Sequence, residues 1–118
     1  MTLSDIMNDK YIYLTTKGRK TGKPHTVELW YATFNEKIYL SHEGGYTDWM
    51  RNIKKDSQIK FKIGKNEFTG KAQIVKNKKE FNEGKHTLYF KYKGNASDEV
   101  VDDWFSESKI IKVLMGKR

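Results

Sequence analysis

Cysteine is absent from this 118-residue chain, and proline occurs only once. The missing thiols exclude disulfide bonds, thiolate catalysis and zinc sites built from cysteine. No apolar run approaches the roughly 20 residues that a membrane-spanning helix needs, and the first ten residues lack the apolar stretch of a signal peptide. We therefore expect a soluble, cytoplasmic protein without a membrane span.

Positive charge, by contrast, is abundant. Lys and Arg number 23 against 15 Asp and Glu, which gives a formal net charge of +8. Such a charge favours an anionic partner: a phosphorylated cofactor, nucleic acid, an anionic membrane surface or an acidic substrate. Aromatic residues make up 14% of the chain, which argues against disorder. The length predicts a single domain over residues 1–118.

Short runs that alternate between apolar and polar residues predict a chain built mostly of β-strands. Strands are expected at 11–16, 25–34, 37–41, 58–63, 67–76 and 110–114, with a two-residue hairpin loop at 35–36. Helices are expected at 3–8, 47–55 and 78–92, and a short one follows Ser97, a suitable N-cap. Gly84 weakens the prediction of the third helix. This order predicts a mainly β fold, an antiparallel barrel with peripheral helices.

One candidate site segment, residues 15–25, reads Thr-Thr-Lys-Gly-Arg-Lys-Thr-Gly-Lys-Pro-His and follows a predicted strand. Its glycines allow a sharp turn that brings backbone N–H groups close to an oxyanion. Arg19 can bind a phosphate with two hydrogen bonds, whereas Lys20 supplies a point charge, and Thr16 and Thr21 add hydroxyl donors. The segment is not a P-loop, because a strand rather than a helix follows it. An ordinary solvated hairpin loop has a similar composition and stays an alternative.

A second candidate segment, residues 41–52, reads Ser-His-Glu-Gly-Gly-Tyr-Thr-Asp-Trp-Met-Arg-Asn. Gly44 and Gly45 leave backbone amides accessible between a strand end and a helix N-terminus, which suits an anion or a cofactor ring. Trp49 and Asn52 lie three residues apart and share one helix face. The alternative reading is a core tryptophan beside a solvated asparagine.

Other chemistries find less support in the sequence. His25, His42 and His86 are scattered without metal-ligand spacing, so no metal site is expected. There is no Gly-x-Ser-x-Gly motif of a hydrolase. Aromatic residues alternate with lysines at 89–93 and again at 61–62, a pattern that can stack bases but is also typical of a half-buried amphipathic face.

In the two candidate segments the sequence resembles the deazaflavin-dependent nitroreductase-like proteins, within the flavin-reductase and pyridoxamine-phosphate-oxidase-like split barrels. Residues 14–24 match the family's motif Leu-Thr-Thr-x-Gly-Arg-Lys-Ser/Thr-Gly-x-Pro-Arg, but His25 replaces its final Arg. Residues 41–52 match its Ser-x-Gly-Gly-like turn and Trp-x-x-Asn. Glu43 is an additional acid there, and the turn before Trp49 is shorter than usual.

The resemblance implies a split antiparallel β-barrel with a cofactor lying across it, either the deazaflavin coenzyme F420 or FMN. It implies that Arg19 and Lys20 hold the phosphate, that the ring rests near residues 41–45, and that Trp49 and Asn52 close the phosphate or ribityl end. The full set of expected cofactor-binding residues is Thr16, Arg19, Lys20, Thr21, Gly22, His25, Ser41, His42, Gly44, Gly45, Trp49 and Asn52.

The resemblance further implies a flavin- or deazaflavin-dependent oxidoreductase, similar to nitroreductases and quinone reductases, that transfers hydride between the bound cofactor and a small organic acceptor. His42, Tyr46 and Tyr92 are candidates for the substrate side, and no residue is assigned as catalytic. A non-catalytic cofactor-binding protein and a basic nucleic-acid-binding β-barrel stay as alternatives. Because split barrels of this kind often dimerise, a homodimer is also expected.

Overall fold

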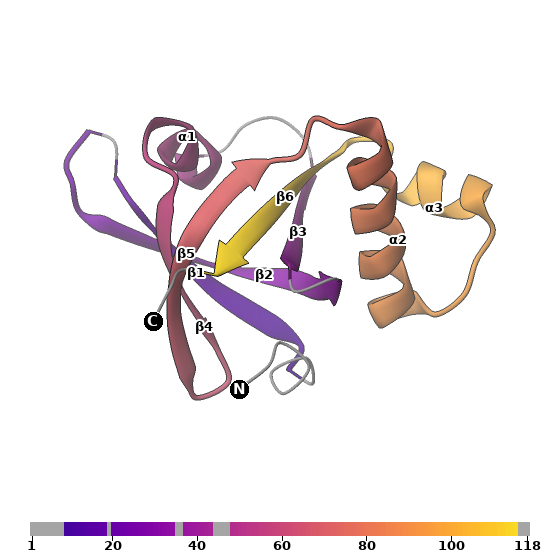
Figure 1. Cartoon of the computed structure of the whole chain (residues 1–118), viewed down its shortest axis with the longest axis horizontal. Coiled ribbons are helices and arrows are strands. Elements are labelled where there is room, and N and C mark those ends of the chain that lie inside the picture. The colour runs from indigo at the N-terminus through magenta and orange to yellow at the C-terminus, as the bar shows by residue number, and fades with distance from the viewer. Residues whose placement is uncertain (1–8, 19, 35–36, 44–47, 116–118) are drawn as a thin grey trace.

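The structure, a computed structural model, describes residues 9–18, 20–34, 37–43 and 48–115 (Figure 1). Six strands pair in the order β1-β2-β3-β6-β5-β4 and close into an antiparallel barrel. The strands are β1 (Tyr11–Lys17), β2 (Pro24–Phe34), β3 (Lys37–Glu43), β4 (Gln58–Ile63), β5 (Asn66–Ile74) and β6 (Ser108–Met115). The predicted fold class, a mainly β antiparallel barrel with peripheral helices, is confirmed.

The barrel is split between β2 and β3. These strands pair only where residues 31–34 face residues 37–40. Closer to the N-terminus, β2 pairs with β1 alone, and residues 41–43 of β3 pair with β6. Among the described residues, the two strands therefore stop pairing with each other beyond Tyr31 and Leu40, and each continues beside its other neighbour.

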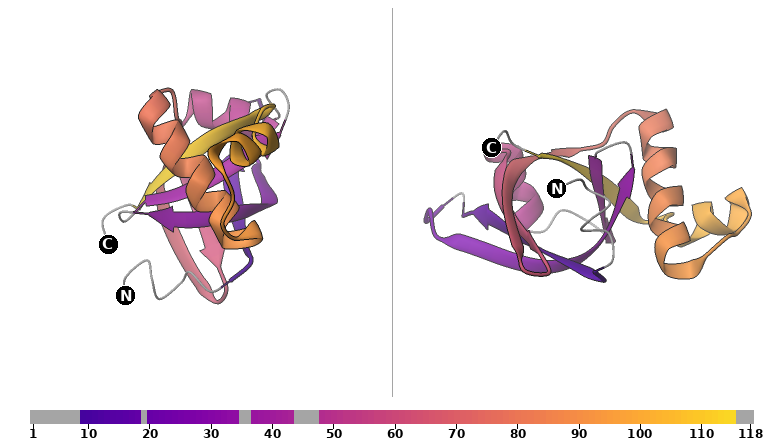
Figure 2. Two further views of the ribbon diagram at one scale, coloured as in Figure 1. Left: turned by 90° about the vertical axis from the view of Figure 1, so that its right-hand side faces the viewer. Right: turned by 60° about the horizontal axis from the view of Figure 1, so that its bottom comes forward.

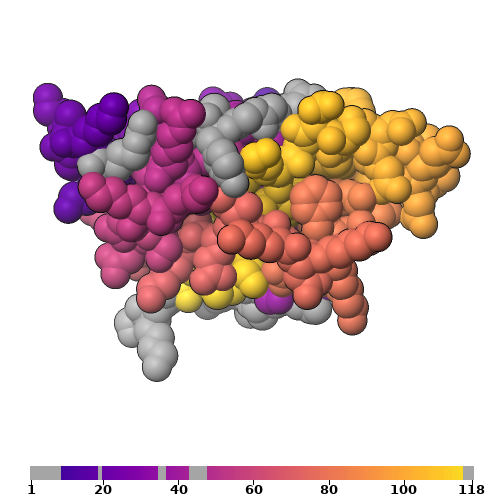
Figure 3. Space-filling model, turned by 90° about the horizontal axis from the view of Figure 1, so that it is seen from above, coloured from indigo at the N-terminus to yellow at the C-terminus, as the bar shows by residue number. Residues whose placement is uncertain are grey.

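Three helices accompany the described part of the barrel: α1 (Asp48–Lys55), α2 (Lys78–Lys93) and α3 (Asp98–Trp104). The helix α1 packs against β1 and β2 close to the β1–β2 hairpin, whereas α2 packs against β2, β3 and β6 (Figure 1). Seen from above, the magenta α1 lies towards one end of the molecule and the orange α3 at the other (Figure 3). The same separation is visible after rotation in Figure 2.

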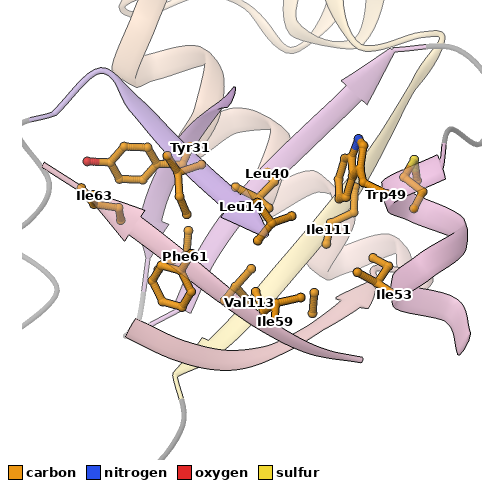
Figure 4. Close-up of a cluster of buried hydrophobic side chains, with 14 residues drawn as sticks. Leu14, Tyr31, Leu40, Trp49, Ile53, Ile59, Phe61, Ile63, Ile111 and Val113 are labelled. Carbon is orange, nitrogen blue, oxygen red and sulfur yellow. The ribbon is translucent and has the colours of Figure 1, made fainter. Parts of the chain in front are cut away.

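Apolar side chains from the strands and from α1 fill the barrel interior. Burial along β4 alternates strictly, with Ile59, Phe61 and Ile63 inside and the residues between them exposed. Trp49 and Ile53 project from α1 towards these side chains and close the barrel at that end (Figure 4). The alternation that predicted the strands is thus the alternation that builds the core.

The structure also explains Gly84 in the interior of α2. A Cβ atom at this position would lie 2.8 Å from Cγ2 of Ile110 and 3.1 Å from Cδ1 of Tyr39. The glycine therefore permits the close approach of α2 to the barrel, which outweighs its low helix propensity. The expected helix at 3–8 and the hairpin loop at 35–36 lie outside the described residues. No described helix is long and apolar enough to cross a membrane.

Candidate functional site

The β1–β2 loop is a compact turn stabilised by its own backbone. The N–H of Gly22 donates to the carbonyl of Gly18 at 2.8 Å, and the N–H of Gly18 donates to the carbonyl of Lys23 at 2.8 Å. Gly22 has a φ of 75°, a conformation that glycine adopts without strain. The hydroxyl of Thr21 accepts from the N–H of Lys23 at 3.3 Å. The loop therefore holds its cationic side chains on a defined backbone.

A buried hydrogen bond joins this loop region to α1. The Nδ2 of Asn52 donates to Oγ1 of Thr16 at 2.9 Å, and the two residues are 3% and 1% exposed. Thr16 lies at the end of β1, directly before the loop, whereas Asn52 lies on the inner face of α1. Because a buried polar group is costly to leave unpaired, this bond fixes α1 against the base of the loop.

A hollow of about 240 Å³, called here the loop–helix hollow, opens between the β1–β2 loop and α1. A second hollow of about 410 Å³ adjoins it and shares Gly18 and Asn52 with it. The loop–helix hollow is lined by Gly18, Lys20, Thr21, Lys23, Pro24, His25, Asp48 and Asn52. The second hollow is lined by Lys17, Gly18, Gly22, Asn52, Lys55 and Asp56.

The loop–helix hollow is suited to an anion. Lys20 and Lys23 are exposed and pair with no carboxylate in the described ranges of the chain. The first turn of α1 also borders the hollow, and the N-terminus of a helix carries a partial positive charge. Asp48 is the single acid in the lining, against two lysines. Ammonium groups, a hydroxyl and a helix N-terminus together form a donor set that fits a phosphate.

The residues predicted on β3 lie beside this region without lining either hollow. Ser41 pairs with Ile110 and His42 pairs with Lys109 in the register between β3 and β6. The ring of His42 meets the ring of Trp49 edge to face, with 5.9 Å between the centroids and an angle of 87°. Trp49 itself is 3% exposed and belongs to the barrel core. The tryptophan therefore links β3, α1 and the core.

The structure thus brings together part of the predicted set. Lys20, Thr21, Gly22, His25 and Asn52 line the two adjoining hollows, and Thr16 is hydrogen-bonded to Asn52. Ser41, His42 and Trp49 form a neighbouring group along β3 and α1. Arg19, Gly44 and Gly45, together with the substrate-side candidate Tyr46, lie outside the described residues.

Tyr92, another substrate-side candidate, lies on α2. Its ring stacks on Trp30 with the centroids 4.2 Å apart and the planes at 13°. Its hydroxyl donates to the carbonyl of Lys10 at 2.6 Å and accepts from the N–H of Tyr31 at 2.9 Å. Tyr92 therefore connects α2 with the beginning of β1, and it lines neither of the hollows beside the loop.

Seven residues that line the two hollows are not in the expected cofactor-binding set: Lys17, Gly18, Lys23, Pro24, Asp48, Lys55 and Asp56. For Asp48 and Lys55 a signal was present in the sequence. Asp48, Asn52 and Lys55 are spaced by four and three residues, so they share one face of a helix. Once Asn52 is placed in the site, this spacing brings its helical neighbours there as well.

The antiparallel strand order, with β2 and β3 paired over only part of their length, is that of a split β-barrel. Residues 2–99 match the model of the F420H2-dependent quinone reductase family, and the chain belongs to this family. The protein is therefore a member of a family of deazaflavin-dependent oxidoreductases, which confirms the prediction of an oxidoreductase. No curated protein matches the chain.

Solved structures share the fold at low sequence identity. The conserved hypothetical protein Rv2991 from Mycobacterium tuberculosis is 21% identical with a TM-score of 0.81, over 99% of this chain and 82% of that one. An F420-H2 dependent reductase, FDR-A, is 15% identical with a TM-score of 0.65, over 88% and 93%. A candidate pyridoxamine 5'-phosphate oxidase from Listeria innocua is 12% identical with a TM-score of 0.70, over 98% and 90%. These likenesses establish the split-barrel fold.

Proposed function

We propose that this protein binds the coenzyme F420 through the loop–helix hollow and transfers hydride between the coenzyme and a small organic acceptor of the quinone or nitro class. One observation carries the proposal. The buried hydrogen bond between Asn52 and Thr16, 2.9 Å long, holds the basic loop against α1 so that its donors surround a single hollow. The family to which the chain belongs supports the identity of the coenzyme.

The residues present fit the phosphate end of such a coenzyme. Lys20 and Lys23 supply two ammonium groups, and Thr21 supplies a hydroxyl. The hollow of about 240 Å³ is smaller than the roughly 300–1,000 Å³ of pockets that enclose a drug-sized ligand. It therefore suits a phosphate group, and the rest of the coenzyme extends beyond it.

The reduced coenzyme supplies a hydride when it is bound. The protein's own residues orient it and limit the access of water. Lys20 and Thr21 would hold the phosphate end, and Ser41 and His42 would lie beside the ring, with the ring of His42 packed edge to face on the buried Trp49. A fixed orientation of this kind lowers the entropic cost of bringing the acceptor to the ring.

Fluorescence titration of the purified protein with F420 and, in parallel, with FMN tests the cofactor assignment. We expect saturable binding of F420 and weaker binding of FMN. Tight binding of FMN alone would move the proposal to a flavin enzyme, and binding of neither would overturn it. Oxidation of the reduced coenzyme by a small quinone or nitro compound then separates catalysis from the alternative, a non-catalytic binding protein.

Loss of one cation from the hollow tests the site itself. Replacing the ammonium group in Lys20→Ala removes a charged hydrogen bond worth about 1.5–3 kcal/mol, so the dissociation constant for F420 should rise roughly 10- to 100-fold. The matched control is Lys79→Ala, an exposed lysine on α2 that lines neither hollow. Equal affinities in the two variants would exclude Lys20 from the site.

Two further expectations stay predictions. Sedimentation of the purified protein measures whether it forms the expected homodimer, and fractionation of the source cells measures whether it is cytoplasmic. Neither result changes the assignment of the coenzyme.

A further inference from the structure

Exposed apolar side chains gather at the end of the molecule that lies opposite the loop–helix hollow. Six large apolar side chains are exposed among the described residues, and four of them lie at this end: Phe34, Phe90, Val100 and Trp104. We call this surface the helical end; it consists of α2, α3 and Phe34 at the end of β2. The left-hand view of Figure 2 looks directly at it. A concentration of this kind marks an interaction surface.

These side chains belong to one surface around a hollow. A hollow of about 520 Å³ has Phe34, Tyr89 and Phe90 in its lining, and Phe90 is 62% exposed. The ring of Trp104 packs edge to face on that of Tyr89, with the centroids 5.9 Å apart. Val100 lies four residues before Trp104 and shares its side of α3. The helical end therefore offers both a projecting ring, that of Phe90, and a hollow beside it.

The helix α3 has few apolar contacts of its own. Val101 is its single buried residue, and its main packing partner is α2. An ion pair between Lys85 and Asp102 attaches it there, together with a contact of 3.0 Å between Nε2 of His86 and Oδ1 of Asp98. Figure 1 shows α3 on the side of α2 that faces away from the barrel. Its exposed apolar side chains are therefore placed to be covered by another molecule rather than by the barrel.

Charge favours a second copy of this chain as that molecule. Residues 78–107 hold seven of the 15 acidic residues but only five of the 23 lysines and arginines. This stretch is thus slightly negative, whereas the rest of the chain is strongly positive. Two copies repel each other wherever their basic surfaces meet, so their approach is least opposed at the helical end.

The charged residues around the helical end are also self-complementary. Lys79 and Lys93 on α2 are exposed, and so are Glu99 and Asp103 on α3. None of these four forms an ion pair within the part of the chain that the structure describes. A two-fold axis sets a patch against the same patch of the other copy, so acids of one α3 can meet lysines of the other α2.

The size of the helical end fits such an interface. The molecule measures 43 by 33 by 21 Å, and α2 and α3 lie at one end of its longest axis (Figure 1). The end face therefore spans the two shorter dimensions, 33 by 21 Å. A specific interface buries about 800 Å² on each partner, which a face of these dimensions can supply.

We propose that the helical end is the interface of a homodimer, in which α2 and α3 of the two copies pack as four helices about a two-fold axis. In this arrangement the ring of Phe90 enters the hollow of the other copy, and aromatic rings form the centre of the interface. The loop–helix hollow lies at the other end of each copy, beside α1 (Figure 3), so both of these hollows stay open to ligand. The inference therefore does not depend on the proposed function.

Sedimentation equilibrium of the purified protein without coenzyme measures the dissociation constant of the dimer. The variants Phe90→Glu and Val100→Glu place a carboxylate in the proposed interface. The matched controls Tyr13→Glu and Leu114→Glu introduce the same charge on the barrel, at side chains that are 42% and 37% exposed. Circular dichroism melts verify that all four variants fold, which their exposed positions permit.

We expect the wild type to dimerise and each helical-end variant to raise the dissociation constant roughly 10-fold or more, because an unpaired carboxylate is costly to bury. The controls should match the wild type. A wild type that stays monomeric at every concentration would overturn the inference and leave the helical end to a different partner. Dissociation by a control but not by Phe90→Glu would place the interface on the barrel and overturn it as well.

Spin labels test the orientation of the two copies. The chain has no cysteine, so one introduced cysteine carries one label. In Glu99→Cys the two labels of a dimer lie near the interface, whereas in Lys54→Cys, on α1, they lie towards the far ends. We expect the labels at position 54 to be separated by more than the 43 Å length of one copy and those at position 99 by less. The reverse order would overturn the inference even for a stable dimer.

Titration with F420 separates this inference from the proposed function. Phe90→Glu should bind F420 as the wild type does, because the interface and the loop–helix hollow lie at opposite ends of each copy. Loss of affinity in this variant would contradict the arrangement of the copies. If no protein binds F420, the proposed function fails, but the sedimentation result still decides the interface.

Discussion

Lysines at the two ends of this molecule have opposite surroundings. At the α2 end they are bound into the structure: Lys37 and Lys112 pair with Glu80 at 3.1 and 3.0 Å, and Lys85 pairs with Asp102. At the loop end, Lys20 and Lys23 pair with no carboxylate in the described residues. The same residue type therefore stabilises packing at one end and is available to a ligand at the other.

The pKa values follow this division. The ammonium groups of Lys112 and Lys37 hold the pKa of Glu80 below its usual value. At Lys91, burial lowers the pKa to about 8, although its Nζ donates to the carbonyl of Tyr31 at 2.8 Å. A lysine that takes part in packing is thus identified by its partners and burial, and net charge alone does not distinguish it from one that binds a ligand.

The largest effect should come from breaking the packed end. Gly84→Val places side-chain atoms where a Cβ alone would lie 2.8 Å from Ile110, so α2 must move away from the barrel. Overpacking of this kind costs about 1–3 kcal/mol or more. Urea denaturation measures the loss, with the exposed Lys79→Val on the same helix as control. Unchanged stability would mean that α2 is not tightly docked. The affinity of the folded protein for F420 should change little.

A smaller effect is expected at the loop end. Asn52→Ala removes the donor to the buried hydroxyl of Thr16 and should lower the free energy of unfolding by about 1–3 kcal/mol. Affinity for F420 should fall as well, because the loop loses its anchor on α1. A double-mutant cycle with Thr16→Val isolates the pair, and a coupling energy near zero would show that the hydrogen bond does not hold the loop.

The smallest effect is a change in pH dependence at Lys91. The unfolded chain keeps this lysine protonated up to about its ordinary pKa of 10.5, whereas the folded protein loses the proton near pH 8. Between these values the unfolded state binds more protons, so the wild type should gain stability as the pH rises. Lys91→Met should lack this gain. Urea midpoints at pH 7.5 and 9.5 measure it, and parallel profiles for the two proteins would contradict the assignment.

Much of the fold could be predicted because it depends on local patterns. The alternation in β4 reappears as strict alternation of burial, and Ser97 caps α3 as expected, with its hydroxyl accepting from the N–H of Val100 at 3.3 Å. Gly84 is an instructive exception. A glycine is needed there because a Cβ atom would come too close to Tyr39 and Ile110. Both residues are remote in sequence, so helix propensity could not predict the need for glycine.

The candidate site could be predicted only in part, and for a similar reason. The residue types of the two motifs predicted the loop and α1 as separate parts of a site. The hydrogen bond that joins them connects residues 36 positions apart, so no local pattern could predict it.

The divergence of β2 and β3 has a consequence for how this protein tolerates mutation. Along residues 25–30, alternate peptide groups of β2 point away from β1, and no described strand pairs with them. A ligand that lies along this edge of β2 can therefore be recognised by the main chain, which every amino acid carries except for the missing N–H of proline. Substitution by alanine should not change such contacts, because it leaves the main chain intact. Relatives can therefore keep these contacts although their side chains in this strand differ.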